Sequence, residues 1–219
     1  MTVFIIAMES EAQPFIDALA DTQIKKVHGR TVITGKLNGK PAAAVVCGVG
    51  KVNAAAGAQY AIDCLCADKI VNIGVAGGLN AGTQIGKIYS ISQVVQYDFD
   101  LSVINGTPIG TLNEYAEPYI SVDCSPCYPA KKLGTGDRFD DSERDYLLLN
   151  DALKADVRDM EFGAIAHVCK HAGVQCYSFK AISDVAGAGS TTKQFAINLA
   201  MCAKALSEEF ENIFEAVNG

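Results

Sequence analysis

Residues 179–186, FKAISDVA, give the clearest indication of fold and chemistry in this chain. The apolar part of the segment predicts a buried β-strand, and the strand ends near the carboxylate of Asp184, just before a loop that contains Gly187 and Gly189. In open α/β sheets, ligands bind at the carboxyl ends of the strands. We therefore expect the acidic side chain of Asp184 to meet a substrate.

Two further carboxylates occupy comparable positions. Glu11 lies just beyond the apolar run of residues 3–8, VFIIAM, and Glu161 opens a predicted helix shortly after Val157. Acidic side chains at the ends of buried strands indicate chemistry rather than solubility. We interpret Glu11, Glu161 and Asp184 as candidate site residues.

Strand-like runs alternate with helical patterns along the chain. Several of the runs are continuously apolar, as expected when both faces of a sheet are covered. We predict strands near residues 2–7, 31–37, 41–47, 69–74, 87–95 and 175–182. We predict helices near residues 9–20, 51–66, 142–153, 160–172 and 192–217. This alternation indicates a layered α/β fold.

Three local patterns refine this prediction. Gly29 and Asn38-Gly39 are typical of hairpin turns, so we expect part of the sheet to be antiparallel. No linker rich in Pro, Gly or Ser divides the chain, which predicts a single domain over residues 1–219. The last predicted helix carries one apolar stripe, formed by Phe195, Leu199, Cys202, Leu206, Ile213 and Val217.

Composition excludes several classes of protein. The chain has 219 residues, 49% of them hydrophobic, and a net charge of −7, with no basic run that could bind nucleic acid. No segment approaches the roughly 20 apolar residues of a membrane helix, and no charged leader precedes the first apolar run. We expect a soluble, cytoplasmic protein with no nucleic-acid or membrane partner.

The cysteines and histidines favour structural roles over metal binding. The eight cysteines are expected to be free thiols, and Cys47, Cys169, Cys176 and Cys202 lie in apolar contexts. Cys124 and Cys127 have the C-x-x-C spacing, but no second pair completes a zinc site. His167 and His171 lie four residues apart on one helix face without an H-E-x-x-H motif, so a helix-surface or core role is expected.

Two glycine clusters follow predicted strands. Gly48-Val49-Gly50 precedes an Ala-rich helix, and residues 74–78, GVAGG, follow the apolar run of residues 69–73. Neither cluster matches the G-x-G-x-x-G dinucleotide fingerprint or a P-loop. On these residues alone, each cluster predicts a tight turn.

Five motifs together resemble one known family. They are AMESE at residues 7–11, GVGKVNA at 48–54, NIGVAGG at 72–78, DME at 159–161 followed by AIAHV at 164–168, and AISDVA at 181–186. Their order and spacing resemble the methylthioadenosine/S-adenosylhomocysteine nucleosidases of the purine and uridine nucleoside phosphorylase superfamily. The resemblance implies a three-layer nucleoside phosphorylase-like α/β fold with a central mixed sheet flanked by helices. It also implies hydrolysis of the N-glycosidic bond of a 5′-modified adenine nucleoside, with no metal and no organic cofactor.

The resemblance implies a role for each catalytic residue. Cleavage passes through an oxocarbenium-like sugar, so the site must activate water and protonate the departing base. By resemblance, Glu11 is the general base on water, and Asp184, with Ser183 beside it, protonates or hydrogen-bonds purine N7. Glu161 would hold the ribose hydroxyls.

The remaining contacts to substrate follow from the same resemblance. Met160 would lie beside the ribose, and Phe139 would stack on the purine. Ser183, Gly77 and Lys180 are also expected to contact substrate.

This chain departs from the family pattern at several positions. Lys180 stands where the family commonly carries Arg, and Lys lacks the two-pronged donor geometry of Arg. Val75 replaces a residue that usually carries a hydroxyl, and Phe162 replaces the preferred Ala. These departures bear on the substrate and on the rate.

Two alternatives remain open at this stage. A phosphorylase or another purine nucleosidase would share the fold, but Glu9 and Glu11 occupy the segment where phosphorylases cradle phosphate, and carboxylates repel a dianion. A catalytically weak nucleoside-binding protein would fit if Val75 and Lys180 had disabled the site. The family is typically homodimeric, and residues 97–100 resemble its interface region.

Overall fold

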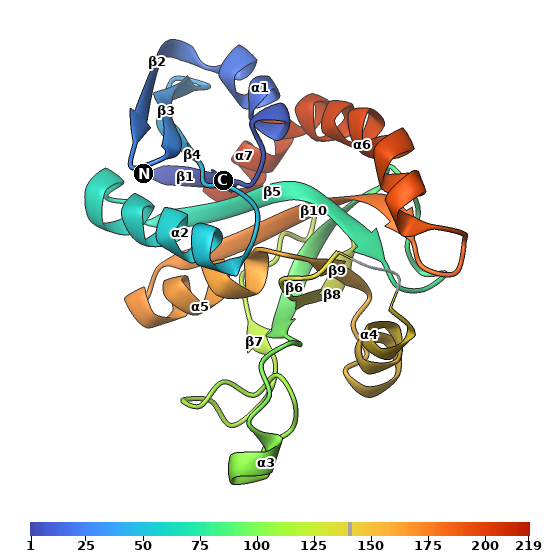
Figure 1. Cartoon of the computed structure of the whole chain (residues 1–219). Coiled ribbons are helices and arrows are strands. Elements are labelled where there is room, and N and C mark those ends of the chain that lie inside the picture. Colours follow the sequence, from blue (N-terminus) through green and yellow to red (C-terminus); the bar gives the residue numbers. More distant parts are fainter. Residues whose placement is uncertain (140–141) are drawn as a thin grey trace.

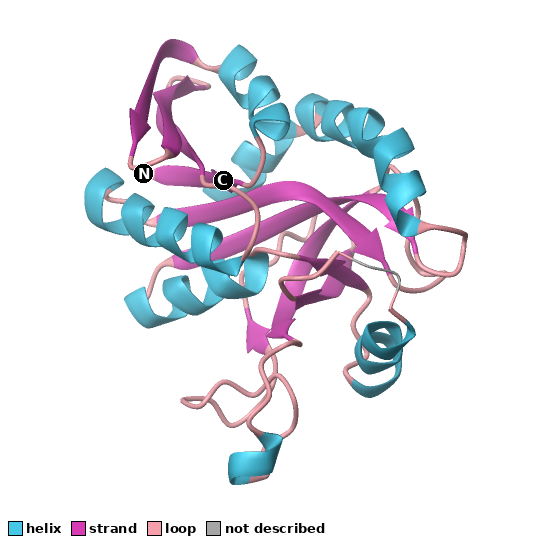
Figure 2. Cartoon of the chain, in the orientation of Figure 1, coloured by secondary structure: helices cyan, strands magenta, loops and turns pink. Residues whose placement is uncertain are grey.

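A ten-stranded mixed sheet with helices on both faces forms the body of the molecule (Figures 1 and 2). The computed structural model describes residues 1–139 and 142–219. The strands are β1 (Thr2–Ile6), β2 (Ala20–Val27), β3 (Arg30–Leu37), β4 (Lys40–Val46), β5 (Lys69–Gly78), β6 (Ile88–Gln96), β7 (Ile120–Ser121), β8 (Ala130–Thr135), β9 (Val157–Asp159) and β10 (Gln175–Val185). The helices are α1 (Glu9–Ala18), α2 (Lys51–Leu65), α3 (Ser102–Asn105), α4 (Glu143–Leu147) with the π-helical turn η1 (Leu148–Ala152), α5 (Phe162–Ala172), α6 (Thr191–Glu208) and α7 (Phe210–Asn218). This arrangement confirms the predicted α/β fold.

Five of the strands close into a ring. β10 pairs parallel to β5 and antiparallel to β6, and β6 pairs parallel to β8. β8 pairs parallel to β9, which returns antiparallel to β5. From β5 an open sheet continues in the order β1, β4, β3, β2. Because β1, β5 and β10 are mutually parallel, their carboxyl ends meet at one edge of the sheet.

The predicted hairpins connect β2, β3 and β4. Both pairings are antiparallel, and the turns fall at His28-Gly29 and Asn38-Gly39. The φ angles are 47° and 80° at the first turn and 50° and 75° at the second, as a two-residue type I′ turn requires. The turn residues therefore set the antiparallel part of the sheet.

Successive side chains along the strands point to opposite faces of the sheet and pack into two hydrophobic cores, one on each face. In β1, Val3 and Ile5 belong to the core under α2 and α5. Phe4 points the other way, where its ring lies 5.2 Å from Phe15 and 4.6 Å from Phe210, under α1, α6 and α7. Figure 1 shows these two helical layers on either side of the sheet.

Several sequence-based boundaries are wrong, each for a local reason. The strand β2 was not expected, because its side chains are exposed and carry no apolar signal. The helix predicted over residues 192–217 breaks at Glu209 into α6 and α7. Residues 74–78 form the end of β5 rather than a turn, so this glycine cluster lies inside the sheet.

The structure also describes the cysteines and the apolar character of the helices. All eight cysteines are free, and Cys47, Cys169, Cys176 and Cys202 are buried as predicted. Among the residues that the structure describes, no helix has both the length and the apolar character that crossing a membrane requires.

Candidate active site

A cavity of about 370 Å³ opens at the edge where β1, β5 and β10 end. Its walls come from the start of α1, the end of β5, the segment after β8, the β9–α5 junction, β10 and α6. The described lining residues are Ala7, Met8, Glu11, Val49, Asn72, Ile73, Gly74, Val75, Ala76, Gly77, Arg138, Phe139, Arg158, Asp159, Met160, Glu161, Lys180, Asp184 and Phe195.

Glu11 lies in the first turn of α1 and is buried in the cavity wall. Its Oε2 accepts a hydrogen bond from the backbone N–H of Met8 at 3.1 Å, and its Oε1 accepts one from the N–H of Val75 at 3.1 Å. Burial raises the pKa of Glu11, although the positive charge of Lys180 and the two amide donors oppose this. The carboxylate is therefore fixed in position and primed to accept a proton.

Glu9 does not share this environment. It is exposed, forms an ion pair with Lys26 at 2.8 Å and accepts a hydrogen bond from Thr31 at 2.5 Å. Of the two carboxylates expected to repel phosphate in this segment, only Glu11 lines the cavity, because Glu9 is paired at the surface.

Glu161 is the residue immediately before α5, at the predicted helix start. Its Oε1 accepts from the backbone N–H of Gly50 at 2.9 Å, and its Oε2 accepts from the N–H of Met160 at 3.3 Å. Burial, followed by the negative charge of Asp159, raises the pKa of Glu161 to about 7, while Lys180 acts in the opposite direction. The first glycine cluster thus supplies a backbone donor to the site.

Lys180 forms a buried ion pair with Asp159. Lys180 is only 1% exposed, and its Nζ lies 2.8 Å from Oδ2 of Asp159. Burial alone would lower the pKa of Lys180, but the charges of Asp159, Glu161 and Glu11 outweigh it and raise the pKa. The ammonium is therefore held charged among three carboxylates.

Asp159 was not predicted as a site residue, although the DME motif contains it. Its Oδ1 accepts from the Thr135 hydroxyl at 2.6 Å, and its Oδ2 accepts from the backbone N–H of Phe162 at 2.9 Å. It thus joins β8, the start of α5 and Lys180 of β10. Sequence spacing could not reveal this role, because the partners lie in separate elements.

Asp184 lies at the carboxyl end of β10, where the sequence predicted it, and lines the cavity. The Ser183 hydroxyl donates to its Oδ1 at 2.7 Å. A Cβ at Gly77 would lie 2.8 Å from Oδ2 of Asp184, so this approach requires glycine. Ser183 itself is buried behind Asp184 and does not belong to the described cavity wall.

The aromatic part of the wall has two rings. Phe139 is 44% exposed, and its ring lies 5.2 Å from that of Phe195, at an interplanar angle of 68°. Phe195 was predicted to be part of the buried stripe of the last helix. It is instead half-buried and lines the cavity, because α6 starts beside the site.

Two arginines in the wall were also missed. Arg138 directs Nη1 to both carboxylate oxygens of Asp145 at 3.0 Å. Arg158 lies in β9, and its Nη2 donates to the Thr191 hydroxyl at 3.4 Å. Arg138 directly precedes Phe139 in the sequence, which offered a signal for it, but nothing in the apolar pattern marks Arg158.

A polar network ties residues 97–100 to the mouth of the cavity. Lys51 Nζ contacts Asp98 Oδ1 at 2.5 Å, and Asp98 Oδ2 accepts from the backbone N–H of Asp137 at 3.0 Å. Asp137 in turn accepts from the N–H of Lys51 at 2.8 Å. Residues 97–100 therefore contact both the start of α2 and the segment that carries Phe139.

The structure brings most of the predicted site residues together in one wall: Glu11, Gly77, Phe139, Met160, Glu161, Lys180 and Asp184. The result is an apolar cavity with buried carboxylates and one paired ammonium. Such a site can position water, hold hydroxyl groups and deliver a proton. Within the described residues, the side chains arranged to hold a metal ion lie outside this cavity, at Glu114, His167 and His171.

The sequence matches the profile of the family described as Phosphorylase superfamily over residues 2–215. It is 31% identical to a 5′-methylthioadenosine/S-adenosylhomocysteine nucleosidase of Shewanella loihica, over 81% of this chain and 83% of that protein. It is 30% identical to the nucleosidase of the same name from Arabidopsis thaliana, over 99% of this chain and 91% of that protein.

Two solved structures share this fold. A 5′-methylthioadenosine/S-adenosylhomocysteine nucleosidase of Colwellia psychrerythraea, solved in complex with adenine, superposes with a TM-score of 0.89 at 26% identity, covering 98% of this chain and 94% of that one. The futalosine hydrolase of Helicobacter pylori shares the fold, with a TM-score of 0.88 at 23% identity and coverage of 98% and 97%.

Proposed function

Because the chain belongs to the phosphorylase superfamily, and within it to the 5′-methylthioadenosine/S-adenosylhomocysteine nucleosidase family, we propose that it is an N-glycosidic hydrolase of 5′-modified adenine nucleosides. Its substrates would be methylthioadenosine and S-adenosylhomocysteine, and its products adenine and the corresponding thioribose. The observation that carries this proposal is the convergence of three buried acids, Glu11, Glu161 and Asp184, on one cavity.

The three acids support a division of labour. Glu11, fixed by two backbone donors and with a raised pKa, would take a proton from the attacking water. Glu161 would hold the ribose hydroxyls, and its charge would stabilise the positive sugar of the transition state. Asp184, oriented by Ser183, would deliver a proton to the purine as the bond breaks.

The cavity wall supports a nucleoside in a defined orientation. Phe139 and Phe195 offer aromatic surface to a flat base. Met160 would contact the ribose between the acids and these rings. Gly77 leaves the space in which Asp184 and the base would meet.

Water is favoured over phosphate as the nucleophile. A phosphate dianion needs unpaired cationic or N–H donors. Near Glu11, the cation is Lys180, and Asp159 already neutralises it at 2.8 Å. With Glu11 and Glu161 beside this pair, a dianion would meet net repulsion.

Release of adenine from methylthioadenosine, followed with and without phosphate, tests this proposal. We expect the same rate after phosphate is removed by dialysis, and a free sugar as the product. Strict dependence on phosphate with a sugar phosphate product would identify a phosphorylase. Binding of the nucleoside without release of base would identify a binding protein.

We further propose that residues 1–219 act as one domain within a cytoplasmic homodimer that serves methionine salvage. Exposed apolar side chains support an interface near the cavity mouth: Val52 is 80% exposed, Val103 98% and Ile104 81%. Val52 lies in α2 and the other two in α3, next to the segment that Asp98 ties to the mouth. Size measurement in solution tests the dimer.

A further inference from the structure

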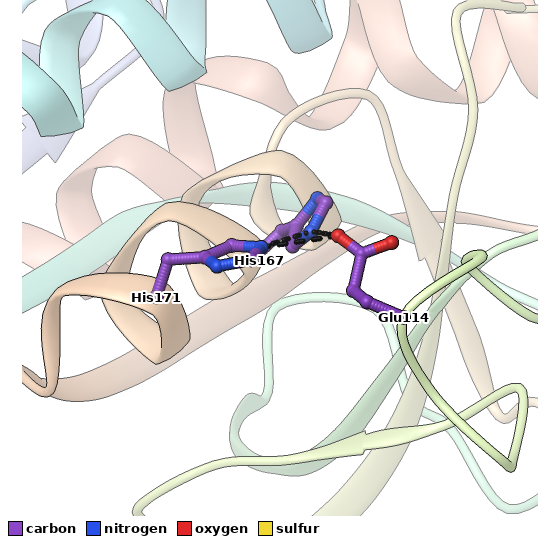
Figure 3. Close-up of side chains that lie close together, drawn as sticks. All are labelled: Glu114, His167 and His171. Atoms are coloured by element: carbon purple, nitrogen blue, oxygen red, sulfur yellow. Dashed lines mark hydrogen bonds and ion pairs between the residues drawn. The ribbon is translucent and has the colours of Figure 1, made fainter.

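Three potential metal ligands converge on the surface of α5, outside the active-site cavity (Figure 3). His167 and His171 lie one helical turn apart and face the same side. Glu114 comes from the segment between α3 and β7, and its carboxylate points toward the two imidazoles. One Glu114 oxygen lies 2.6 Å from Nε2 of His167 and 3.0 Å from Nε2 of His171, and the two Nε2 atoms are 2.9 Å apart.

Hydrogen bonds alone cannot satisfy this triangle of atoms. Three short contacts need three protons, one in each gap. A neutral imidazole offers at most one proton at Nε2, and an ionised carboxylate offers none. The two imidazoles therefore supply at most two protons for the three contacts. One contact of the triangle therefore always lacks a proton.

We propose that Glu114, His167 and His171 form a binding site for a divalent transition-metal ion of the Zn²⁺ class. A cation in the centre of the triangle would take the place of the protons in the three contacts. It would be bound by one lone pair from each imidazole Nε2 and one from the Glu114 oxygen. Two imidazole nitrogens and one carboxylate oxygen are a donor set that Zn²⁺ uses, whereas Mg²⁺ and Ca²⁺ prefer oxygen ligands.

The distances fit such an ion after a small opening of the triangle. Ligands about 2.0–2.1 Å from a tetrahedral ion lie roughly 3.3 Å from one another. The observed separations of 2.6, 2.9 and 3.0 Å are shorter than this by about 0.3 to 0.7 Å, an opening that rotation of the three partly exposed side chains can supply. A fourth position would face solvent.

The surroundings allow an ion to enter and hold the ligands in place. The side chains of His167, His171 and Glu114 are 27%, 59% and 41% exposed. The Tyr115 ring lies 5.7 Å from the His167 ring and 6.4 Å from the His171 ring, which restricts both imidazoles. The site is therefore open on one side and supported on the other.

Metal binding would tie a long surface segment to the body of the protein. Glu114 is separated from the histidines by 53 and 57 residues of sequence. It belongs to the chain between α3 and β7, which projects from the body in Figure 1. A bound ion would fasten this segment to α5, the helix that begins directly after Glu161 of the active site.

Zn²⁺ titration of EDTA-treated protein by calorimetry tests the site. We expect one equivalent to bind to the unmodified chain. His171→Ala and Glu114→Gln should each weaken binding by at least about 10-fold, since even loss of an outer-shell partner costs 10–100-fold. Mg²⁺ and Ca²⁺ should not compete.

Matched variants separate this site from other Zn²⁺ donors. His28→Asn removes the remaining histidine, in the β2–β3 turn, and the pair Cys124→Ser/Cys127→Ser removes the C-x-x-C thiols. Both should bind Zn²⁺ as the unmodified chain does. Loss of binding in the cysteine variant, or unchanged binding in both His171→Ala and Glu114→Gln, would overturn the proposal.

A second measurement reports on the surface segment. Bound Zn²⁺ should slow limited proteolysis between residues 100 and 119 in the unmodified chain and not in His171→Ala. Equal protection in the two proteins would show that the ion binds elsewhere.

Discussion

Replacing Lys180 with Met removes the cation from the most buried ion pair of the site. Met has a similar length and no charge, so the change isolates the electrostatic contribution. Removing one partner of a buried pair costs about 3–5 kcal/mol. Asp159 keeps hydrogen bonds from Thr135 and Phe162, which places the expected loss near the lower limit, at about 3 kcal/mol.

The loss should depend on pH through Glu161. Burial and the charge of Asp159 raise the pKa of Glu161 from 4.5 to about 7, so the folded chain binds this proton more tightly than the unfolded chain. Ionisation of Glu161 therefore lowers the free energy of unfolding as the pH rises from 4.5 to about 7. Lys180 lowers the pKa of Glu161, so removing Lys180 should raise this pKa further and extend the loss of stability to higher pH. The Lys180→Met deficit should be larger at pH 8 than at pH 5.5.

Urea unfolding at fixed protein concentration measures both effects. Lys204→Met is the control, because Lys204 is 76% exposed and its pair with Glu208 should contribute less than about 0.5 kcal/mol. Adding Asp159→Asn to Lys180→Met should recover part of the loss, since the carboxamide can still accept from Phe162. A Lys180→Met deficit no larger than that of Lys204→Met at both pH values would refute the reasoning.

Three further predictions concern the proposed chemistry. Asp184→Asn keeps the acceptor for the Ser183 hydroxyl but cannot transfer a proton, so turnover should fall by about 10²-fold or more while nucleoside binding persists; a nucleoside with an activated leaving group should restore much of the rate, and equal losses on both substrates would contradict the role. Glu11→Gln should lose about 10²–10⁴-fold in turnover with substrate affinity retained by calorimetry, and a fully active variant would require another base. Gly77→Ala places a methyl group 2.8 Å from Asp184, so kcat should fall while the same change at Gly39, which has nothing within 4 Å, should leave kcat unchanged.

Much of the fold follows from local patterns. Continuous apolar runs located β1, β5 and β10, because both faces of these strands are covered and every position favours an apolar residue. The hairpin turns were visible because a type I′ turn restricts its residues strongly. The ring closure through β9 was not visible, because this strand has three residues and its pairing depends on distant neighbours.

Site residues could be predicted where the position of a single residue in the sequence indicates its role. They could not be predicted where the role depends on a contact between two residues that are distant in the sequence. Asp184 lies at the end of an apolar strand and Glu11 shortly after another, so position alone indicates that both reach the edge of the sheet where ligands bind. Asp159 and Lys180 become meaningful only together, and they lie on different strands. The same holds for Glu114, whose histidine partners are more than 50 residues away.

The end of β5 explains why the two proposed catalytic acids can occupy one site. A Cβ at Gly74 would lie 3.0 Å from Glu11 Oε1, and one at Gly77 would lie 2.8 Å from Asp184 Oδ2. Glycine at both positions leaves room for one carboxylate from α1 and another from β10, while the N–H of Val75 binds Glu11. Because β5 belongs to both the ring and the open sheet, the strand that joins the two parts also sets the separation of the acids. A side chain at either glycine would therefore disturb the chemistry before it disturbed the fold.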